Sequence, residues 1–417
     1  MSDVSRIGAG LAVCAALVFG SQRADADVVT EWNQLALKVP SNVGPPQARW
    51  LAMVHVAMHD AINSVTGEYE TYGPRIVSDP DASPEAAGVA AAFHVLATIL
   101  PAGLADYTLA RDAARDAIGE PGWSLGEAVG IAAANYVLAI RSNDGMLLAS
   151  GPYTPGSGPG VWIPTLPAFA SALLPGFGRV IPFALNFGGQ FRPDGPPALS
   201  SEQYAADLNE VKSVGASNSE VLGLRTPQQT ATARFWLGNS IPIFQGIARA
   251  VSLDRHLDLS SNARFFALLS IAGVDAYIAA WDAKYSYNFW RPITAIRAAD
   301  TDGNPATLAD PAWLPFGPTP PFPDYVSGHT TYTGAFVHVL EHVFGTAPVT
   351  YTATNLNVPP AEQLRTYSSF EQLSREMIEA RVLAGIHFRT ADRDGARLGR
   401  QVAQFAMTHL LRVSRDR

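Results

Sequence analysis

Apolar residues recur at three- and four-residue intervals along most of the chain, the spacing that gathers them on one face of an α-helix. The pattern predicts eight helices, over residues 48–65, 83–100, 125–142, 201–214, 260–285, 330–343, 368–384 and 391–412. Ser201 and Ser260 open two of these segments, and serine commonly caps helices. Strand-like alternation is scarce and is clearest at 349–354. We therefore expect a mainly α-helical fold, as one bundle or as two packed bundles.

Long loops rich in glycine and proline are expected to separate some of these helices. The stretches 151–197 and 299–325 are dense in both residues, and the whole chain has 35 Gly and 31 Pro. These residues disfavour helix, and long loops in a compact helical protein usually form the walls or lid of a functional site. No internal repeat or domain boundary is visible, so residues 27–417 are expected to form a single domain.

The N-terminus has the pattern of an export signal. Arg6 precedes an apolar run at 7–20, which is short for a membrane span, and residues 24–26 (Ala-Asp-Ala) fit a signal-peptidase site. We predict that residues 1–26 are a secretory signal and that the protein is secreted or periplasmic. Cys14, the only cysteine, lies in this signal, so the mature chain would have no cysteine chemistry. No later segment is expected to insert into a membrane.

Composition narrows the classes of partner. Apolar residues make up 47 % of the chain and charged residues 16 %, which supplies a large core and excludes general disorder. The net charge of −8 argues against a nucleic-acid partner. Only three of the 29 basic residues are lysines, so the place of each lysine is informative.

Three segments between residues 281 and 392 concentrate cations, histidines and a glycine turn. In the first, Lys284 and Arg291 are seven residues apart and Pro292 follows. Seven residues make about two helical turns, so the two cations can share a helix face. Alone, the pattern also fits an ordinary basic helix end.

The second segment ends in Ser327, Gly328 and His329, directly before a predicted helix. Gly328 allows a ligand to approach the backbone, and a helix start directs free N–H groups and a positive dipole end at an anion. Alone, this segment fits a plain serine-capped turn equally well.

The third segment holds Arg381 and His387. Six residues along an unbroken helix would leave these side chains about 120° apart. Both can serve one site only if the helix ends near Gly385, a natural residue for a helix end. Alone, this segment favours a hydrogen-bonded core histidine.

Together, the three segments describe a site for a tetrahedral or trigonal-bipyramidal oxyanion. Guanidinium groups match oxyanion oxygens in pairs, and lysine adds a point charge. A local cluster of three cations needs a bound anion or nearby carboxylates. Four aspartates are open candidates for the acid that pairs with Arg381, namely Asp275, Asp282, Asp324 and Asp392.

The pattern Lys-x6-Arg-Pro, Ser-Gly-His and Arg-x5-His resembles the signature of the vanadium-dependent haloperoxidases, which acid phosphatases and type 2 phosphatidic-acid phosphatases share. The resemblance covers residues 281–392. It implies a vanadate cofactor, with hydrogen peroxide, a halide and an organic acceptor as the reactants.

The resemblance also implies roles for single residues. Five of them would hold the vanadate oxygens: Lys284, Arg291, Ser327, Gly328 and Arg381. His387 would be the axial ligand of vanadium, and His329 the acid–base group on the opposite side. Lys284 would also polarise the peroxide, while the metal acts as a Lewis acid and template.

Four further positions refine the resemblance. Trp281 and Phe322 stand where chloroperoxidase-type members carry aromatics, and an apolar wall there would desolvate a halide; both also fit as core aromatics. The chain departs from the family at Val326, where proline is usual. It also departs at Ala391, where an acid commonly orients the second histidine, although Asp392 follows directly.

Three other functions remain open. An acid phosphatase would use the same cations, with His387 as the nucleophile and His329 as the leaving-group acid. A zinc hydrolase is suggested by His338, Glu341 and His342, which fit H-x-x-E-H, although paired histidines on a helix face are common. A binding protein could hold phosphate or vanadate without turnover.

Overall fold

The computed structural model describes residues 27–39 and 44–414, and the predicted signal at 1–26, with Cys14, lies outside the described residues. The described chain is mainly α-helical, as predicted. Its helices are α1 (Val28–Ala36), α2 (Pro45–Thr66), α3 (Pro84–Ile99), α4 (Leu104–Ile118), α5 (Gly122–Arg141), α6 (Glu202–Val214), α7 (Pro227–Phe235), α8 (Ile241–Asp254), α9 (Leu259–Tyr287), α10 (Pro292–Arg297), α11 (Gly328–Phe344), α12 (Phe370–Leu383) and α13 (Arg389–His409). Because the predicted signal lies outside the described residues, export stays a prediction.

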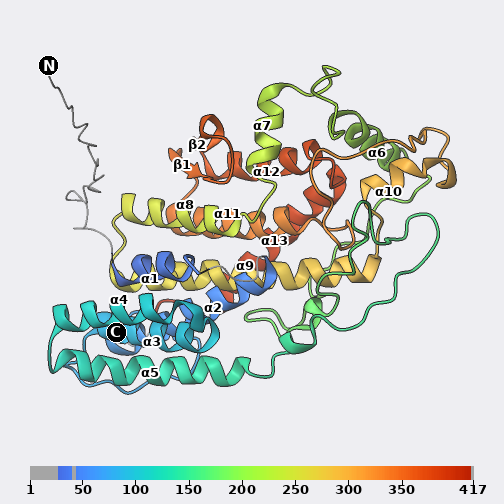
Figure 1. Cartoon of the computed structure of the whole chain (residues 1–417). Coiled ribbons are helices and arrows are strands. Elements are labelled where there is room, and N and C mark those ends of the chain that lie inside the picture. The colour runs from blue at the N-terminus through green and yellow to red at the C-terminus, as the bar shows by residue number, and fades with distance from the viewer. Residues whose placement is uncertain (1–26, 40–43, 415–417) are drawn as a thin grey trace, which may run out of the picture.

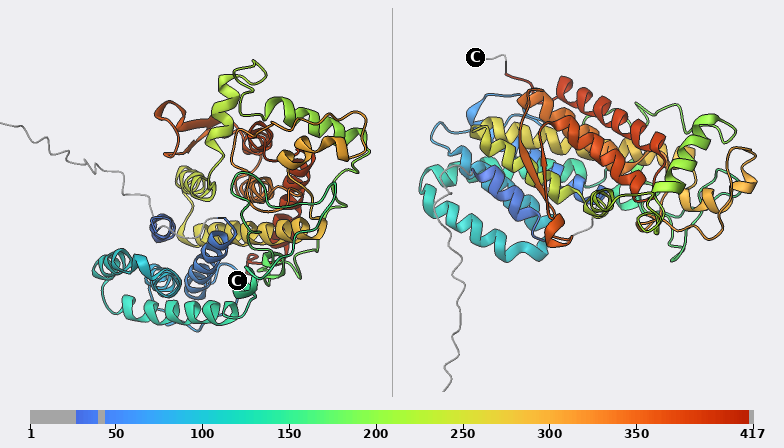
Figure 2. Two further views of the ribbon diagram at one scale, coloured as in Figure 1. Left: turned by 45° about the vertical axis from the view of Figure 1, so that its right-hand side comes forward. Right: turned by 90° about the horizontal axis from the view of Figure 1, so that it is seen from above.

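Helix α9 forms the centre of the molecule. It has 29 residues, and most of them are buried. Helix α2 packs on α9 from one side and α11 and α13 from the other, while α3, α4 and α5 lie beyond α2 (Figure 1). Figure 2 shows the same two groups of helices from two further directions. Because α9 is covered on both sides, it can carry buried polar groups in its last turns.

The eight predicted helices are all present, with ends shifted by a few residues, and five more were not predicted. Ser201 caps α6, as expected, by accepting a hydrogen bond from the Tyr204 amide at 3.2 Å. Helix α9 begins earlier than predicted, because Asp258 and not Ser260 caps it, with the Ser261 amide as donor at 2.8 Å. Asp258 lies before the apolar pattern on which the predicted start of this helix was based.

The predicted strand at 349–354 is present as β1 (Tyr351–Thr354). It pairs antiparallel with β2 (Leu364–Tyr367), which was not predicted, so that Tyr351 lies opposite Tyr367. The two rings stack, with their centroids 5.4 Å apart. This small sheet lies away from the central helix (Figure 1).

Helices α11 and α13 touch backbone to backbone through glycines. A Cβ atom added at Gly399 would lie 2.0 Å from the carbonyl oxygen of Thr331, and one at Gly334 would lie 2.2 Å from that of Ala396. Only glycine permits this approach. The close crossing fixes the first turn of α11 against the first turns of α13.

The loop at 151–197 is largely irregular, as predicted, apart from short 3₁₀ turns such as Phe177–Arg179. Asp275 of α9 anchors it: the carboxylate accepts hydrogen bonds from the amides of three successive residues at 2.7 to 2.9 Å, namely Phe183, Ala184 and Leu185. The anchor brings the loop, including Leu173, to the end of α9.

The prediction that no segment beyond residue 26 suits a membrane is wrong in terms of length and composition. In the described ranges, α5 and α9 are long and apolar enough to cross a membrane, and the bent pair α3–α4 would add a third span. The apolar part of α9 is 94 % buried within the protein, whereas that of α5 is 39 % buried. Packing in the core therefore accounts for the apolar character of α9.

Candidate active site

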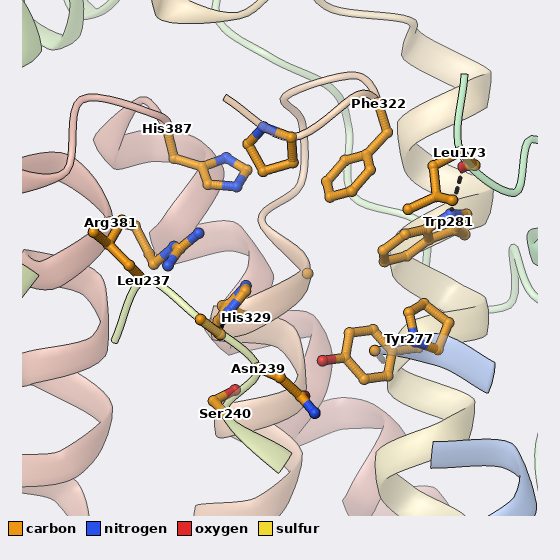
Figure 3. A pocket seen from close by; sticks show the side chains of 15 residues that line it. Leu173, Leu237, Asn239, Ser240, Tyr277, Trp281, Phe322, His329, Arg381 and His387 are labelled. Carbon is orange, nitrogen blue, oxygen red and sulfur yellow. Dashed lines mark hydrogen bonds between the residues drawn. The ribbon is translucent and has the colours of Figure 1, made fainter. Parts of the chain in front are cut away.

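A cavity of about 180 Å³ lies where α8 and α11 begin, α12 ends and α9 approaches its last turns (Figure 3). Its walls are formed by fifteen residues: Gly44, Pro45, Leu173, Leu237, Gly238, Asn239, Ser240, Tyr277, Trp281, Pro320, Phe322, Gly328, His329, Arg381 and His387. Six of the nine predicted site residues are among them. The other three, Lys284, Arg291 and Ser327, lie directly behind the wall and contact residues in it.

Lys284 and Arg291 do not share a helix face, contrary to the prediction. Helix α9 ends at Tyr287, because Asn288 adopts the left-handed conformation with φ 49°. Arg291 is instead the residue before the first turn of α10, where Pro292 begins the helix. The two side chains still converge, because the short connection turns back toward the loop that precedes α11.

Lys284 is fully buried beside the cavity. Its Nζ donates to the carbonyl oxygens of Pro323 at 2.8 Å and Asp324 at 3.0 Å. An ammonium has three N–H groups, so one remains for a ligand. Burial, and then the charge of Arg291, hold the pKa of Lys284 well below its usual value.

Arg291 is held by backbone oxygens and keeps one free nitrogen. Nε donates to the Phe322 carbonyl at 2.7 Å, and Nη1 donates to the Ile386 carbonyl at 2.7 Å. Nη2 has no hydrogen-bond partner among the described residues. Burial lowers the pKa of Arg291 to about 10, so the group remains a cation at neutral pH.

Ser327 precedes α11 but does not cap it with its side chain. Its amide donates to the Ala391 carbonyl at 3.0 Å, which ties the turn to α13. Gly328 follows in close contact with the Trp281 ring, which a Cβ atom at this position would approach to 3.0 Å. The first N–H groups of α11 are therefore free for a ligand, while the Ser327 side chain also lies within reach of the Asp392 carboxyl group.

Arg381 reaches the cavity from the last turn of α12. The helix ends at Leu383, and Gly385 takes φ 75°, so the predicted break before His387 is confirmed. Nη1 donates to the Trp236 carbonyl at 2.6 Å, whereas Nε has no partner in the described part of the chain. Burial lowers the pKa of Arg381 to about 10, against the charge of Asp392.

His387 lies against a buried carboxyl group. Its Nδ1 is 2.8 Å from Oδ1 of Asp324, and its Nε2 is 3.2 Å from Nη1 of Arg291. The first contact is close but not aligned as a hydrogen bond. Burial, followed by Arg291 and Lys284, holds the pKa of His387 well below its usual value, so the ring is neutral.

His329 lies on the first turn of α11 and faces the cavity (Figure 3). Its Nε2 is 3.2 Å from the Gly238 carbonyl, to which it donates, and this leaves Nδ1 as a proton acceptor. Burial, and then the charge of Arg381, hold the pKa of His329 well below its usual value. A neutral imidazole of this kind can take up a proton from a bound reactant.

Aromatic rings form the wall opposite the histidines (Figure 3). The centroids of Trp281 and Phe322 are 5.0 Å apart, and those of Tyr277 and Trp281 are 5.7 Å apart. Nζ of Lys284 lies 4.8 Å from the centroid of Phe322. The predicted aromatics therefore join the cavity and are not remote core residues.

Sequence reasoning missed several residues of the site. Tyr277 precedes Trp281 by one helical turn, and this spacing on α9 could have indicated it. Asn239 and Ser240, at the start of α8, and Leu173, from the long loop, carry no comparable signal. They reach the cavity only through tertiary packing.

The four candidate aspartates now have distinct partners. Asp275 anchors the long loop, and Asp282 pairs with Arg192 at 2.6 Å, so neither belongs to the cavity. Asp324 and Asp392 are buried among the site cations. Asp392 is the carboxyl group whose charge raises the pKa of Arg381. Asp324 contacts His387 and so takes the place of the orienting acid that the chain lacks at position 391.

The H-x-x-E-H residues lie on α11, away from the cavity. His338 is 2.9 Å from the Gln404 side chain, and its Nδ1 is 3.8 Å from Glu341. Arg400 also pairs with Glu341, at 3.2 Å. Within residues 27–39 and 44–414, no three histidine, cysteine or acidic side chains gather as metal ligands. The pattern is thus accounted for by surface hydrogen bonds and ion pairs.

Comparison with known proteins extends this picture. Residues 264–416 match a family model described as the VCPO second helical-bundle domain. Over 184 residues the chain is 30 % identical to the vanadium chloroperoxidase of Curvularia inaequalis, a match that covers 37 % of this chain and 30 % of that protein. The sequence match thus spans less than a third of the relative's length.

Solved structures resemble the chain over nearly its whole length. The first bacterial vanadium-dependent iodoperoxidase has a TM-score of 0.79 at 25 % identity, with 94 % of this chain and 96 % of that chain covered. An apo bacterial vanadium-dependent chloroperoxidase has a TM-score of 0.75 at 18 % identity, with 92 % and 98 % covered, which shows a likeness of fold.

A helical fold whose central cavity gathers three cations, two histidines and a helix start defines an oxyanion-binding protein of the haloperoxidase type. By sequence over its last third, and by fold over nearly its whole length, the chain resembles the vanadium-dependent haloperoxidases. The vanadium-dependent relatives imply vanadate as the cofactor. The site fits that anion, because Arg291 Nη2 and Arg381 Nε are buried donors without a partner in the described ranges.

Proposed function

We propose that this protein is a vanadate-dependent haloperoxidase, which oxidises a halide with hydrogen peroxide and passes a hypohalous-acid equivalent to an organic acceptor. The observation that carries the proposal is the division of one cavity into two walls (Figure 3). One wall offers cationic donors and histidines, and the other is aromatic. The first suits an oxyanion, and the second suits a halide or an apolar acceptor that must leave water.

The residues of the site can each be given a part in this reaction. Lys284, Arg291 and Arg381 would hold the vanadate oxygens together with Ser327 and the Gly328 amide, and His387 would bind vanadium through Nε2. Vanadate, when bound, supplies a Lewis acid that activates peroxide.

His329 would accept the peroxide proton at Nδ1, while the Gly238 carbonyl keeps the ring oriented through Nε2. The neutral state of the ring, imposed by burial and Arg381, makes it a base at neutral pH. The remaining N–H of Lys284 would polarise the peroxide, because the other two are bound to carbonyls. Trp281 and Phe322 would exclude water from the halide.

An acid phosphatase remains the second candidate, and one contact favours it. A nucleophilic histidine needs an orienting partner, and in the sequence the absence of an acid at position 391 argued against His387 as a nucleophile. Asp324 lies 2.8 Å from His387 and supplies such a partner from another segment. The same cations would stabilise the transition state of phosphoryl transfer.

Bleaching of a halogen-accepting dione tests the proposal. The mature protein would be assayed with bromide and hydrogen peroxide, with and without orthovanadate, and then with an aryl phosphate. Bleaching that requires vanadate and is suppressed by phosphate is the expected result. Aryl phosphate hydrolysis that vanadate inhibits, without any bleaching, would instead establish the phosphatase.

Substitution of His329 separates an enzyme from a binding protein. His329→Ala should abolish halide oxidation and leave vanadate bound, because the residue lies beside the anion and holds none of its charge. His338→Ala on the same helix is the matched control, since His338 contacts Gln404 away from the cavity. Equal activity of both variants would contradict the proposed role.

A further inference from the structure

The side chain of Asp324 is buried in the active site without an assigned task. Its exposed fraction is 0 %, and its polar contacts, which include the Phe388 amide, are not well aligned as hydrogen bonds. Leaving a carboxyl group in this state is unfavourable. Burial raises the pKa of Asp324 to about 7, against the lowering effect of Arg291 and Lys284. The unfavourable free energy of burying this carboxyl group indicates that the residue has a function.

The backbone of Asp324 is fixed on both sides, so its side chain has a defined direction. The amide donates to the Phe289 carbonyl at 2.9 Å, and the carbonyl accepts from Nζ of Lys284 at 3.0 Å. The nearest side-chain nitrogens are then Nδ1 of His387 at 2.8 Å and Nη1 of Arg291 at 3.8 Å. Of these, His387 is much the nearer.

The contact determines which nitrogen of His387 is free. A carboxyl oxygen beside Nδ1 favours the tautomer with the proton on Nδ1, which leaves the lone pair on Nε2. Nε2 already lies 3.2 Å from Nη1 of Arg291, and this nitrogen can donate a hydrogen bond to that lone pair. A small rotation of the ring would align the Nδ1–H with Asp324, and such hydrogen bonds often tighten only when the site is loaded.

We propose that Asp324 is the positioning residue of His387. From its place in the segment that leads to Ser-Gly-His, it performs the task of the acid that is missing at position 391. This inference rests on the proposed vanadate site. A carboxylate behind a metal-binding histidine fixes the ring and raises its basicity. Asp324 acts through His387 and does not itself touch the anion.

The sign of the effect on anion binding distinguishes this role from simple electrostatics. If Asp324 acted only as a charge, its removal from a cation cluster would strengthen the binding of every anion. If it positions His387, its removal weakens vanadate, which bonds to Nε2, and spares phosphate, which the cations hold without that bond. General damage to the site would weaken both anions alike.

The experiment measures the Kd of orthovanadate and of phosphate for wild type, Asp324→Asn and Asp324→Ala, by titration calorimetry with the protein folded. We expect the vanadate Kd to rise by roughly 10- to 100-fold, with the phosphate Kd unchanged or lower. The ⁵¹V NMR signal of the bound anion should shift in the variants. Asp282→Asn is the matched control, because Asp282 pairs with Arg192 outside the cavity.

A double-mutant cycle completes the test. In a His387→Ala background, Asp324→Asn should no longer weaken vanadate binding, so that the Kd is unchanged or lower, because the ring to be positioned is gone. Equal weakening of vanadate and phosphate, or tighter binding of both, would overturn the inference. Wild-type protein that binds phosphate but not vanadate would instead refute the proposed function, so the two failures are distinguishable.

Discussion

The crossing of α11 and α13 provides a sharp test of how packing supports the site. In Gly399→Ala, the new Cβ would lie 2.0 Å from the Thr331 carbonyl oxygen and 2.7 Å from the Ala335 amide nitrogen. Both atoms belong to backbone, so no side chain can rotate away. The helices must separate by about 1 Å before the contact becomes tolerable, and overpacking of this kind costs about 1–3 kcal/mol or more.

The same displacement reaches the active site. The first turns of α13 carry Asp392 and the Ala391 carbonyl, which accepts the Ser327 amide at 3.0 Å. An error of about 1 Å in positioning can reduce a rate by about 100-fold. We therefore expect Gly399→Ala to lower the free energy of unfolding by about 3 kcal/mol and to reduce vanadate-dependent bleaching by at least tenfold.

Urea denaturation and the dione assay measure these two effects. Gly246→Ala is the matched control, because it makes the same change inside α8, where the nearest atom is the end of Arg249 at 3.7 Å. Helix propensity predicts that this control is stabilised by about 0.5–1 kcal/mol. If Gly399→Ala unfolds at the same urea concentration as wild type, the backbone contact between the helices does not exist as described.

Two further predictions concern the aromatic wall and the buried core. Phe322→Leu should raise the halide KM by roughly tenfold, about 1.4 kcal/mol, with the vanadate Kd unchanged; an unchanged KM would place the halide elsewhere. His55 is buried and its pKa is lowered to about 3 by burial and Arg249, so the unfolded chain takes up the proton first as pH falls. Between pH 7 and 5 the wild type should therefore lose about 2 kcal/mol of stability relative to His55→Gln, measured by urea denaturation at both pH values; a constant difference would show that His55 is accessible to protons.

The sequence predicted the longer helices with a clear apolar face and missed helices whose apolar pattern is weak, short or interrupted. Helix α4 has a single buried residue, Tyr107, so its apolar pattern is weak. Helix α8 has a buried face, but Pro242 and Gly246 obscure it, although proline is acceptable in a first turn. The predicted end of α9, at residue 285, was two residues too early, because the left-handed turn at Asn288 that ends the helix depends on its surroundings.

The site was predictable as a set of residues but not as a set of contacts. Three motifs named seven of the nine candidates, because each motif has fixed internal spacing, and the aromatic positions Trp281 and Phe322 came from the resemblance. The partner of His387 is Asp324, which is 63 residues away in the chain, and no local pattern links them. The fold supplies such pairs, and sequence spacing alone therefore left four aspartates open.

The unpartnered donors lead to a last prediction, on ligand-dependent stability. Arg291 Nη2 and Arg381 Nε are buried without a partner among the described residues, and each such donor is unfavourable by about 1–3 kcal/mol. An oxyanion that accepts both hydrogen bonds relieves this penalty in the folded state alone. At a concentration 100 times its Kd, it should stabilise the protein by about 2.7 kcal/mol.

Thermal unfolding with and without orthovanadate measures this gain as a rise of several degrees in Tm. Arg381→Met should lose most of the rise, because the variant lacks one of the waiting donors and one of the charges. Arg397→Met is the matched control, since Arg397 is 65 % exposed and pairs with Asp394 on the surface of α13. A Tm rise that survives in Arg381→Met would mean that the Arg381 guanidinium does not hold the anion, and it would contradict the assignment of this cavity as the anion site.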